Sequence, residues 1–370
     1  MIYLDNAATT FPKPKVVYDA VEYAMKNYSF NAGRGLYKAA LNTFNMIDET
    51  RSKIADLVNA SKDKVIFSSS ATESLNQIIY GMDFKDGDIV YISPFEHNAI
   101  VRTLQNTKAI VKILPFDKKT WLLDYNLTKD QFTIYKPKAV FVSHVSNVTG
   151  YELPYSKIFE IAHDVGAITV LDSAQGLGVY NVNPKNVDLL VFAGHKSLYA
   201  IFGIAGFINI GNINLYPIKL GGTGSDSLNV YMPKEMPSKY EAGSMNSVAI
   251  YALSKSIDFL NGNNYSGKEE ELMIYLIKRL KSISKVKLYL PENIVTKGII
   301  SFNVEGYMAD EVGMILSEDY DICVRTGYHC APIIHDFLED KEFGGTVRVS
   351  IGIFNTKEEL DVLINAIKEM

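Results

Sequence analysis

Short apolar runs alternate with more polar stretches between residues 65 and 210. Most of these runs have the length and the composition of buried strands. They occupy residues 65–67, 88–92, 109–115, 139–144, 167–171, 187–193 and 206–210. Several are followed by helix-like stretches, as at Ser68–Leu75, which begins with a cluster of capping residues. Because strands separated by helices form parallel sheets with both faces covered, the pattern predicts an α/β fold with a mostly parallel sheet.

The pattern changes near residue 250. Strand-like runs and longer helical stretches follow it, and they occupy residues 248–260, 268–284, 298–304, 346–350 and 357–369. A chain of 370 residues is long enough for about two domains. We therefore expect a large α/β domain over residues 15–247 and a smaller α+β domain formed by residues 1–14 together with 248–370.

Composition narrows the class of protein. Hydrophobic residues make up 47% of the chain and charged residues 21%, with a net charge of −5. These values are typical of a globular protein, and they favour neither a nucleic-acid partner nor a membrane surface. The N-terminus lacks the features of a signal peptide, and no apolar stretch is long enough to span a membrane. With two cysteines there is no pattern for disulfides or a zinc site, so we expect a cytoplasmic protein without a metal.

Two charged residues stand at the ends of neighbouring apolar runs. Asp172 ends one run, and Lys196 follows another in Gly194-His195-Lys196. The carboxyl ends of adjacent parallel strands face one crevice, so the two side chains can meet there. A lysine that binds covalently and an aspartate that pairs with a ring nitrogen suit pyridoxal phosphate (PLP). Read singly, Lys196 is a solvated loop residue and Asp172 a helix N-cap.

Polar residues follow other predicted strands as well. Ser68–Thr72 lies before a helix, where free backbone amides bind phosphate, although Ser70 or Thr72 can also serve as a plain N-cap. His97 can stack on a flat cofactor or relay protons, or be an ordinary surface residue. Asn147 can bind the cofactor's phenolic oxygen or simply form a turn.

The segment Arg325–Pro332 contains Cys330, which of the two cysteines is the better candidate for a reactive thiol. Positive charge lowers the pKa of a thiol, and we expect Arg325 and His329 to supply such charge to Cys330. Glycine and proline in the segment predict an exposed loop. Arg348 lies on an otherwise apolar strand, where its guanidinium needs either a substrate carboxylate or a structural ion pair.

With these motifs in order, the chain resembles the NifS/SufS-like cysteine desulfurases of the class V aminotransferase family, which are fold type I PLP enzymes. The resemblance extends from Tyr3–Thr10 to Arg348 and Phe354–Thr356. The segment Arg325–Ala331 looks like the signature of group II, which selenocysteine lyase-like members share. The family implies a mostly parallel sheet in the large domain and a smaller α+β C-terminal domain that carries the active cysteine.

The resemblance implies a role for the residues around the ring of PLP. Lys196 would hold PLP and move the proton on the substrate Cα. Asp172 and Gln175 would contact the ring, and His97 would stack on it.

The phosphate of PLP would be held by a second group of residues. Thr72, the backbone amides of Ala71 and Thr72, and His195 would bind it. Ser244 would reach the phosphate in the partner subunit, which makes a homodimer obligatory.

The resemblance also implies how the substrate is handled. Arg348 would bind the carboxylate of L-cysteine, with Asn147 and Arg325 beside it. Cys330 would attack the substrate sulfur, keep it as a persulfide for a sulfur-acceptor protein, and release L-alanine.

Some positions depart from the common pattern of the family. Ala193 replaces a frequent Ser or Thr, Ala200-Ile201 a frequent Gly-Pro, Tyr37 a frequent His, and Ser244 a frequent Thr. Because a lost hydrogen bond to a charged group is worth about 1.5–3 kcal/mol, we expect PLP to be bound less tightly than in a typical relative.

Other functions fit part of this pattern. A selenocysteine lyase that cleaves L-selenocysteine would carry the same Cys330. A class V aminotransferase would need a keto-acid acceptor and leave Cys330 idle. A nucleotide-binding or scaffold protein is disfavoured because no GxGxxG loop follows the first strand.

Overall fold

The largest element of the computed structural model is a seven-stranded sheet. The structure describes residues 1–33, 35–224, 228–262, 266–291, 294, 296 and 298–370. The strands are β2 (Val65–Ser68), β3 (Ile89–Ile92), β4 (Ile110–Ile113), β5 (Ala139–Ser143), β6 (Ile168–Asp172), β7 (Leu189–Ala193) and β8 (Ala205–Asn209). Their order is β2-β8-β7-β6-β5-β3-β4, and β8 alone runs antiparallel to its neighbours. The predicted mostly parallel sheet is confirmed.

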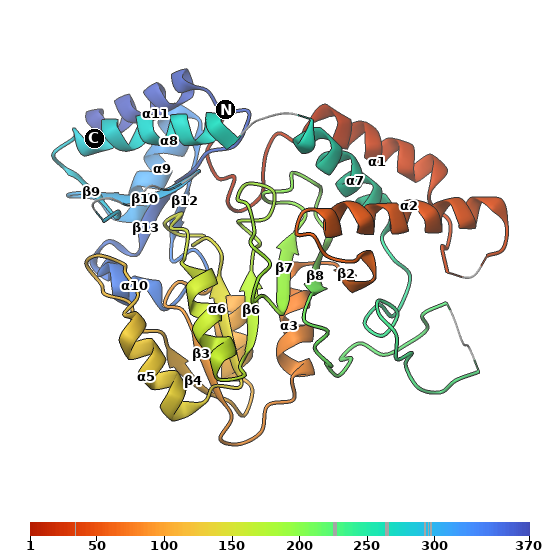
Figure 1. The fold of residues 1–370 in the computed structure, drawn as a ribbon. Helices are drawn as coiled ribbons and strands as arrows, with labels where there is room; N and C mark the ends of the chain where they lie inside the picture. Colours follow the sequence, from red (N-terminus) through yellow and green to blue (C-terminus); the bar gives the residue numbers. More distant parts are fainter. Residues whose placement is uncertain (34, 225–227, 263–265, 292–293, 295, 297) are drawn as a thin grey trace.

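Both faces of this sheet are buried, which explains the continuous apolar runs. On β5, Val140 and Val142 belong to one hydrophobic cluster and Phe141 to another on the opposite face. Helices cover the two faces (Figure 1). They are α1 (Lys15–Asn27), α2 (Lys38–Asp56), α3 (Ala71–Gly81), α4 (Asn98–Gln105), α5 (Tyr125–Tyr135), α6 (Tyr155–Asp164) and α7 (Ser247–Asn261).

A smaller antiparallel sheet lies beside the large one (Figure 1). Its order is β12 (Arg325–Gly327), β13 (Thr346–Ser350), β10 (Ile299–Val304), β9 (Val286–Leu288). Its other elements are α8 (Ser266–Lys281), α9 (Ala309–Tyr320), α10 (Ile334–Leu338), α11 (Lys357–Glu369), and the short 3₁₀ turn Lys341–Phe343; a similar turn, Lys62–Lys64, precedes β2. Leu276, Phe302, Val347 and Leu363 lie in its hydrophobic core.

The N-terminal residues join this second sheet region. The strand β1 (Ile2–Tyr3) pairs in parallel with β11 (Ile322–Cys323). Helix α7 instead packs against α1 and α2, and its Ile250 and Leu253 lie in the core of the large sheet. The division of the chain into residues 15–247 and residues 1–14 with 248–370 stays a prediction.

None of the described helices is long and apolar enough to cross a membrane.

Candidate active site

A cavity of about 230 Å³ opens where the parallel strands of the large sheet end. Ser143 of β5 pairs in register with Asp172 of β6, and Lys196 follows the end of β7. Residues of β12, β13 and the N-terminal segment close the other side. The cavity is lined by Ala7, Ala8, Ser70, Ala71, Thr72, Leu75, His97, Ala99, Ser143, Val145, Asn147, Asp172, Ala174, Gln175, Ala193, His195, Lys196, Arg325, His329 and Arg348.

Lys196 and Asp172 meet in this cavity, as the strand pattern predicted. Burial lowers the pKa of the Lys196 amine, and the nearby Asp172 opposes that shift. The amine makes no hydrogen bond or ion pair with any residue that the structure describes. Burial raises the pKa of Asp172, one of whose oxygens accepts the Ala174 amide at 3.1 Å. The Lys196 amine and the second oxygen of Asp172 are therefore available to a ligand.

His97 is the N-cap of α4, and a hydrogen bond to the backbone fixes the tautomer of its ring. Its Nδ1 accepts the backbone N–H of Ala99 at 3.0 Å, so a neutral ring carries its proton on Nε2. Burial, with Lys196 nearby, lowers the pKa of His97 to about 4. The ring is therefore neutral at pH 7, as stacking on a cofactor requires.

The phosphate end of the predicted site lies at the start of α3. Ser70 is the N-cap, because its Oγ accepts the Glu73 amide at 3.1 Å. Ala71 and Thr72 occupy the first turn beyond it, where backbone amides point out of the helix. Thr72 therefore does not act as the cap. His195 lines the same cavity, and its buried Nδ1 has no partner among the described residues.

Arg348 is fully buried on β13 and has both an ion pair and a place in the cavity. Its Nη2 binds Asp5 at 2.7 Å, and its Nη1 donates to the Asn147 carbonyl at 2.7 Å. Its Nε has no partner among the described residues. Gln175, predicted to contact the ring, donates its amide to the Ala7 carbonyl at 2.8 Å. For Arg348, the structural ion pair is present, and the binding of a substrate carboxylate stays a prediction.

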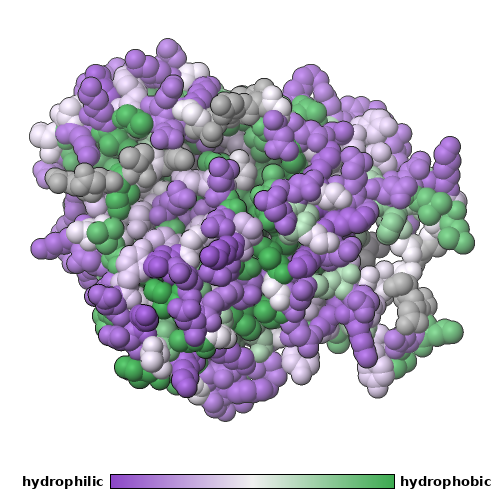
Figure 2. All heavy atoms as spheres, viewed as in Figure 1, coloured by the Kyte–Doolittle hydropathy of each residue, from purple (hydrophilic) through white to green (hydrophobic). Residues whose placement is uncertain are grey.

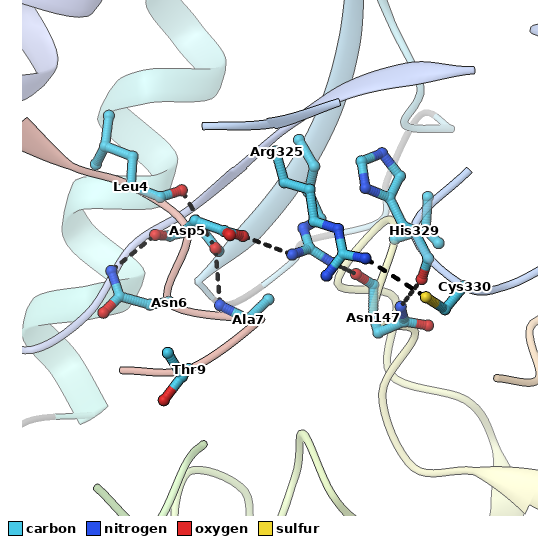
Figure 3. A network of polar contacts seen from close by, with 12 residues as sticks. Leu4, Asp5, Asn6, Ala7, Thr9, Asn147, Arg325, His329 and Cys330 are labelled. Atoms are coloured by element: carbon cyan, nitrogen blue, oxygen red, sulfur yellow. Dashed lines mark hydrogen bonds and ion pairs between the residues drawn. The ribbon is translucent and has the colours of Figure 1, made fainter. Parts of the chain in front are cut away.

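Cys330 is exposed on the loop after β12, as predicted. Arg325 Nη2 contacts its Sγ at 3.4 Å, and Figure 3 shows this contact beside the Asp5 ion pair. His329 does not supply positive charge, contrary to expectation. Its ring is buried, burial lowers its pKa well below the usual value, and its Nε2 lies 3.0 Å from the Thr346 carbonyl. Arg325 is the positively charged residue that contacts the thiol.

Ser244 lies outside this cavity. It is exposed and lines two larger pockets, of about 450 and 550 Å³, near the buried pair of Arg51 and Glu241. Ser244 is not among the residues that line the cavity with Lys196, and its contact with PLP across a dimer stays a prediction.

The unmatched groups of the cavity fit PLP. The free Lys196 amine suits an aldehyde, the Asp172 carboxyl a protonated ring nitrogen, and the start of α3 with His195 an anion. No metal-binding cluster of three His, Cys, Asp or Glu side chains occurs among the described residues.

Two carboxyl groups of the site escaped the sequence analysis. Asp5 pairs with Arg348, and Glu96 accepts the amide of Ser143 at 2.7 Å and its hydroxyl at 2.8 Å. Glu96 stands next to His97, which is the only local signal. The sequence around Asp5 gave no local signal of its ion pair, because its partner lies 343 residues away.

Comparison with known proteins supports one family. The model of the class-V aminotransferases matches residues 2–363. A relative from Methanothermobacter thermautotrophicus, named "Probable cysteine desulfurase", is 33% identical over 100% of this chain and 94% of its own. The cysteine desulfurase structure from Thermococcus onnurineus NA1 is 30% identical, with a TM-score of 0.91 over 100% of this chain and 94% of that one. Escherichia coli CsdA is 25% identical, with a TM-score of 0.85 over 99% and 94%.

Proposed function

Because this chain belongs to the class-V aminotransferase family, we propose that it is a PLP-dependent cysteine desulfurase. It would convert L-cysteine into L-alanine and leave the sulfur on Cys330 as a persulfide. The observation that carries the proposal is the position of Cys330. Its exposed thiol contacts Arg325, and Arg325 lines the cavity that holds Lys196.

PLP would be held by Lys196, Asp172, Gln175, His97, the start of α3 and His195. When bound, it supplies the electron sink that makes the Cα–H of an amino acid acidic. Lys196 then takes and returns that proton, which its lowered pKa favours because an amine must be neutral to act as a base. Arg348, with Asn147 and Arg325, orients the substrate carboxylate.

The sulfur transfer itself belongs to Cys330. Its thiolate, stabilised by Arg325, attacks the sulfur of bound cysteine. A sulfur–sulfur bond forms as the Cβ–S bond of the substrate breaks. The electron pair of the broken bond stays with Cβ, which takes up a proton and becomes the methyl group of alanine. Cys330 is left as the persulfide, and no external oxidant or reductant is needed.

A single-turnover reaction tests this proposal. PLP-loaded protein is mixed with L-cysteine, and alanine and protein-bound sulfane sulfur are measured together, beside Cys330→Ala. We expect equal amounts of both products in the wild type and neither in the variant. Alanine without a persulfide would point to a lyase, and selenocysteine turnover by Cys330→Ala would support that reading. No alanine without a keto acid would favour an aminotransferase.

We further propose an obligate homodimer in which Ser244 reaches the phosphate of the partner subunit. Its exposed position beside large pockets supports this. The segment between β8 and α7 projects from the body and exposes Leu220, Leu228, Val230 and Tyr231. Hydrophobic residues are visible on that side of the molecule in Figure 2. An apolar surface of this kind is typical of a subunit interface.

The persulfide requires an acceptor, which we propose is a separate sulfur-carrier protein that reaches the exposed Cys330 loop. Both cysteines are free thiols, which is typical of cytoplasmic proteins, and we propose that location.

A further inference from the structure

Cys330 stands on a strained turn. Tyr328–Ala331 closes with a bond from the Ala331 amide to the Tyr328 carbonyl at 3.0 Å. Its two central residues, His329 and Cys330, have φ of 46° and 58°. Such a turn prefers glycine or asparagine at both positions, and neither is present. Strained backbone of this kind persists only where the surroundings fix it, and it is typical of functional sites.

Three carbonyls of this turn, those of Tyr328, His329 and Cys330, are bound from outside the turn. The His329 carbonyl accepts Asn147 Nδ2 at 2.7 Å, a contact that Figure 3 shows. The Cys330 carbonyl accepts the Asn98 amide at 2.7 Å. The Tyr328 carbonyl lies 2.9 Å from His335 Nε2. These three contacts come from three different parts of the chain and hold the thiol in one place.

The contact from His335 constrains the protons on its ring. A carbonyl only accepts, so Nε2 must carry a hydrogen. On the other side, Nδ1 lies 2.6 Å from Asp340 Oδ2. An unprotonated Nδ1 and a carboxylate oxygen would both be acceptors. The contact between His335 and Asp340 therefore needs a second proton, carried either by the imidazole or by the carboxyl group. His335 and Asp340 are 1% and 0% exposed, and Asp340 Oδ1 has no partner among the described residues. The pair is therefore closed to water, and the proton between them keeps Nε2 as a donor.

We propose that His335 and Asp340 are positioning residues for Cys330, acting through the Tyr328 carbonyl. The buried pair clamps the start of the turn and keeps the thiol next to Arg325. This inference rests on the proposed role of Cys330 as the nucleophile. His335 touches neither the substrate nor the thiol, so its effect must appear in the geometry of Cys330.

Two substitutions of His335 separate the clamp from simple packing. In His335→Asn the amide nitrogen replaces Nδ1, which keeps the Asp340 contact and loses the Tyr328 contact. In His335→Gln the amide nitrogen replaces Nε2 and keeps the Tyr328 contact. His163→Asn is the control, because His163 of α6 forms another His–Asp contact, from its Nε2 to Asp188 at 3.0 Å.

The first readout is persulfide formation from L-cysteine by the PLP-loaded variants. We expect His335→Asn to lower kcat by about 100-fold, since small displacements of a reacting group have effects of that order. The KM and the absorbance of bound PLP stay unchanged, and His335→Gln and His163→Asn remain close to the wild type. If kcat fell equally in His335→Asn and His335→Gln, or if only KM changed, the proposal that His335 positions Cys330 would be wrong.

The second readout does not depend on turnover. Iodoacetamide labelling at pH 7 is followed by mass spectrometry at Cys330 and at Cys323, the half-buried internal control. We expect slower labelling of Cys330 in His335→Asn only, because the thiol leaves Arg325. Unchanged or faster labelling would overturn the proposal. If the wild type makes no alanine at all, the proposed function fails, while the labelling still tests the clamp.

A third measurement needs no variant and applies even if His335→Asn does not fold. The ¹⁵N–¹H spectrum of the histidine rings in the wild-type protein reports which ring nitrogens carry protons. A protonated Nε2 at His335 supports the clamp, and an unprotonated Nε2 would overturn it.

Discussion

Two buried carboxyl groups, Asp172 at the end of β6 and Glu96 between β3 and α4, have different partners. Asp172 lies near the Lys196 amine, whereas Glu96 is bound only by serines and by a backbone amide. Burial therefore raises the pKa of Glu96 to about 8, so that it is mostly protonated at pH 7. A neutral Glu96 adds no negative charge near Asp172, the residue predicted to pair with the ring nitrogen of PLP.

The contribution of Glu96 to the free energy of unfolding should decrease as the pH rises. Its pKa is 4.5 unfolded and about 8 folded, so its contribution is full below 4.5 and is lost between these values. We expect wild-type stability to fall relative to Glu96→Gln by up to about 1.4 kcal/mol per pH unit in that window. Urea unfolding from pH 5 to pH 8 measures it, and parallel curves for the two proteins would contradict it.

Ala193 offers a test of cofactor anchoring. It lines the cavity at the end of β7 and is 2% exposed. A serine there would add a donor for the phosphate, so we expect Ala193→Ser to tighten PLP binding by about tenfold or more. Titration of the cofactor-free protein with PLP measures the Kd. Ala205→Ser, on the strand paired with Ala193, is the control that should leave the Kd unchanged.

Local sequence signals located some of these residues and not others. Lys196 and Asp172 could be predicted because each follows a buried strand, and strand ends meet in a parallel sheet. Asp5 and His335 could not, because their importance lies in partners that only the folded chain brings near them. Asp5 meets Arg348, and His335 meets a carbonyl that carries no sequence signal.

At the scale of elements, one buried ion pair fastens α2 to the edge of the large sheet. Arg51 of α2 binds Glu241 at 2.8 Å and the Val65 carbonyl at 2.6 Å. Glu241 also accepts the Phe67 amide at 2.6 Å. Both side chains are below one tenth exposed, so each depends largely on the other as the partner for its charge.

Removing one charge of this pair should be strongly destabilising. We expect Glu241→Gln to lower the free energy of unfolding by about 3–5 kcal/mol, because it leaves a buried guanidinium without a countercharge. Asp19→Asn is the control, since it breaks an exposed pair with Lys15 that is worth less than about 1 kcal/mol. A loss in Glu241→Gln no larger than in the control would show that the pair is not structural. Denaturant unfolding measures both.

Continuous apolar runs were the best guide to the elements. The seven strands of the large sheet and helix α11 lie where the pattern predicted them. The strands β11 and β12 span two and three residues, too few to show any periodicity. Their place is fixed instead by pairing with β1 and β13.

At the scale of the whole molecule, the proposed dimer makes each site a product of two chains. Lys196→Ala should be inactive, and Ser244→Asp should be inactive because a carboxylate repels the phosphate. Exchange of subunits between the two variants would create one site with both native residues in each mixed dimer. We expect about a quarter of wild-type alanine formation after equal mixing. No recovery, despite exchange shown by mass spectrometry, would mean that Ser244 does not act across the interface.

The ion pair of Asp5 and Arg348 also determines when the two sides of the cavity can come together during translation. The ribosome makes Asp5 343 residues before its partner, and Arg348 lies on β13, the last strand that the structure describes. A nascent chain can therefore complete the large sheet with Lys196 in place while the substrate side of the cavity is still missing. The geometry that generates reactive sulfur is therefore assembled only after β13 has been made.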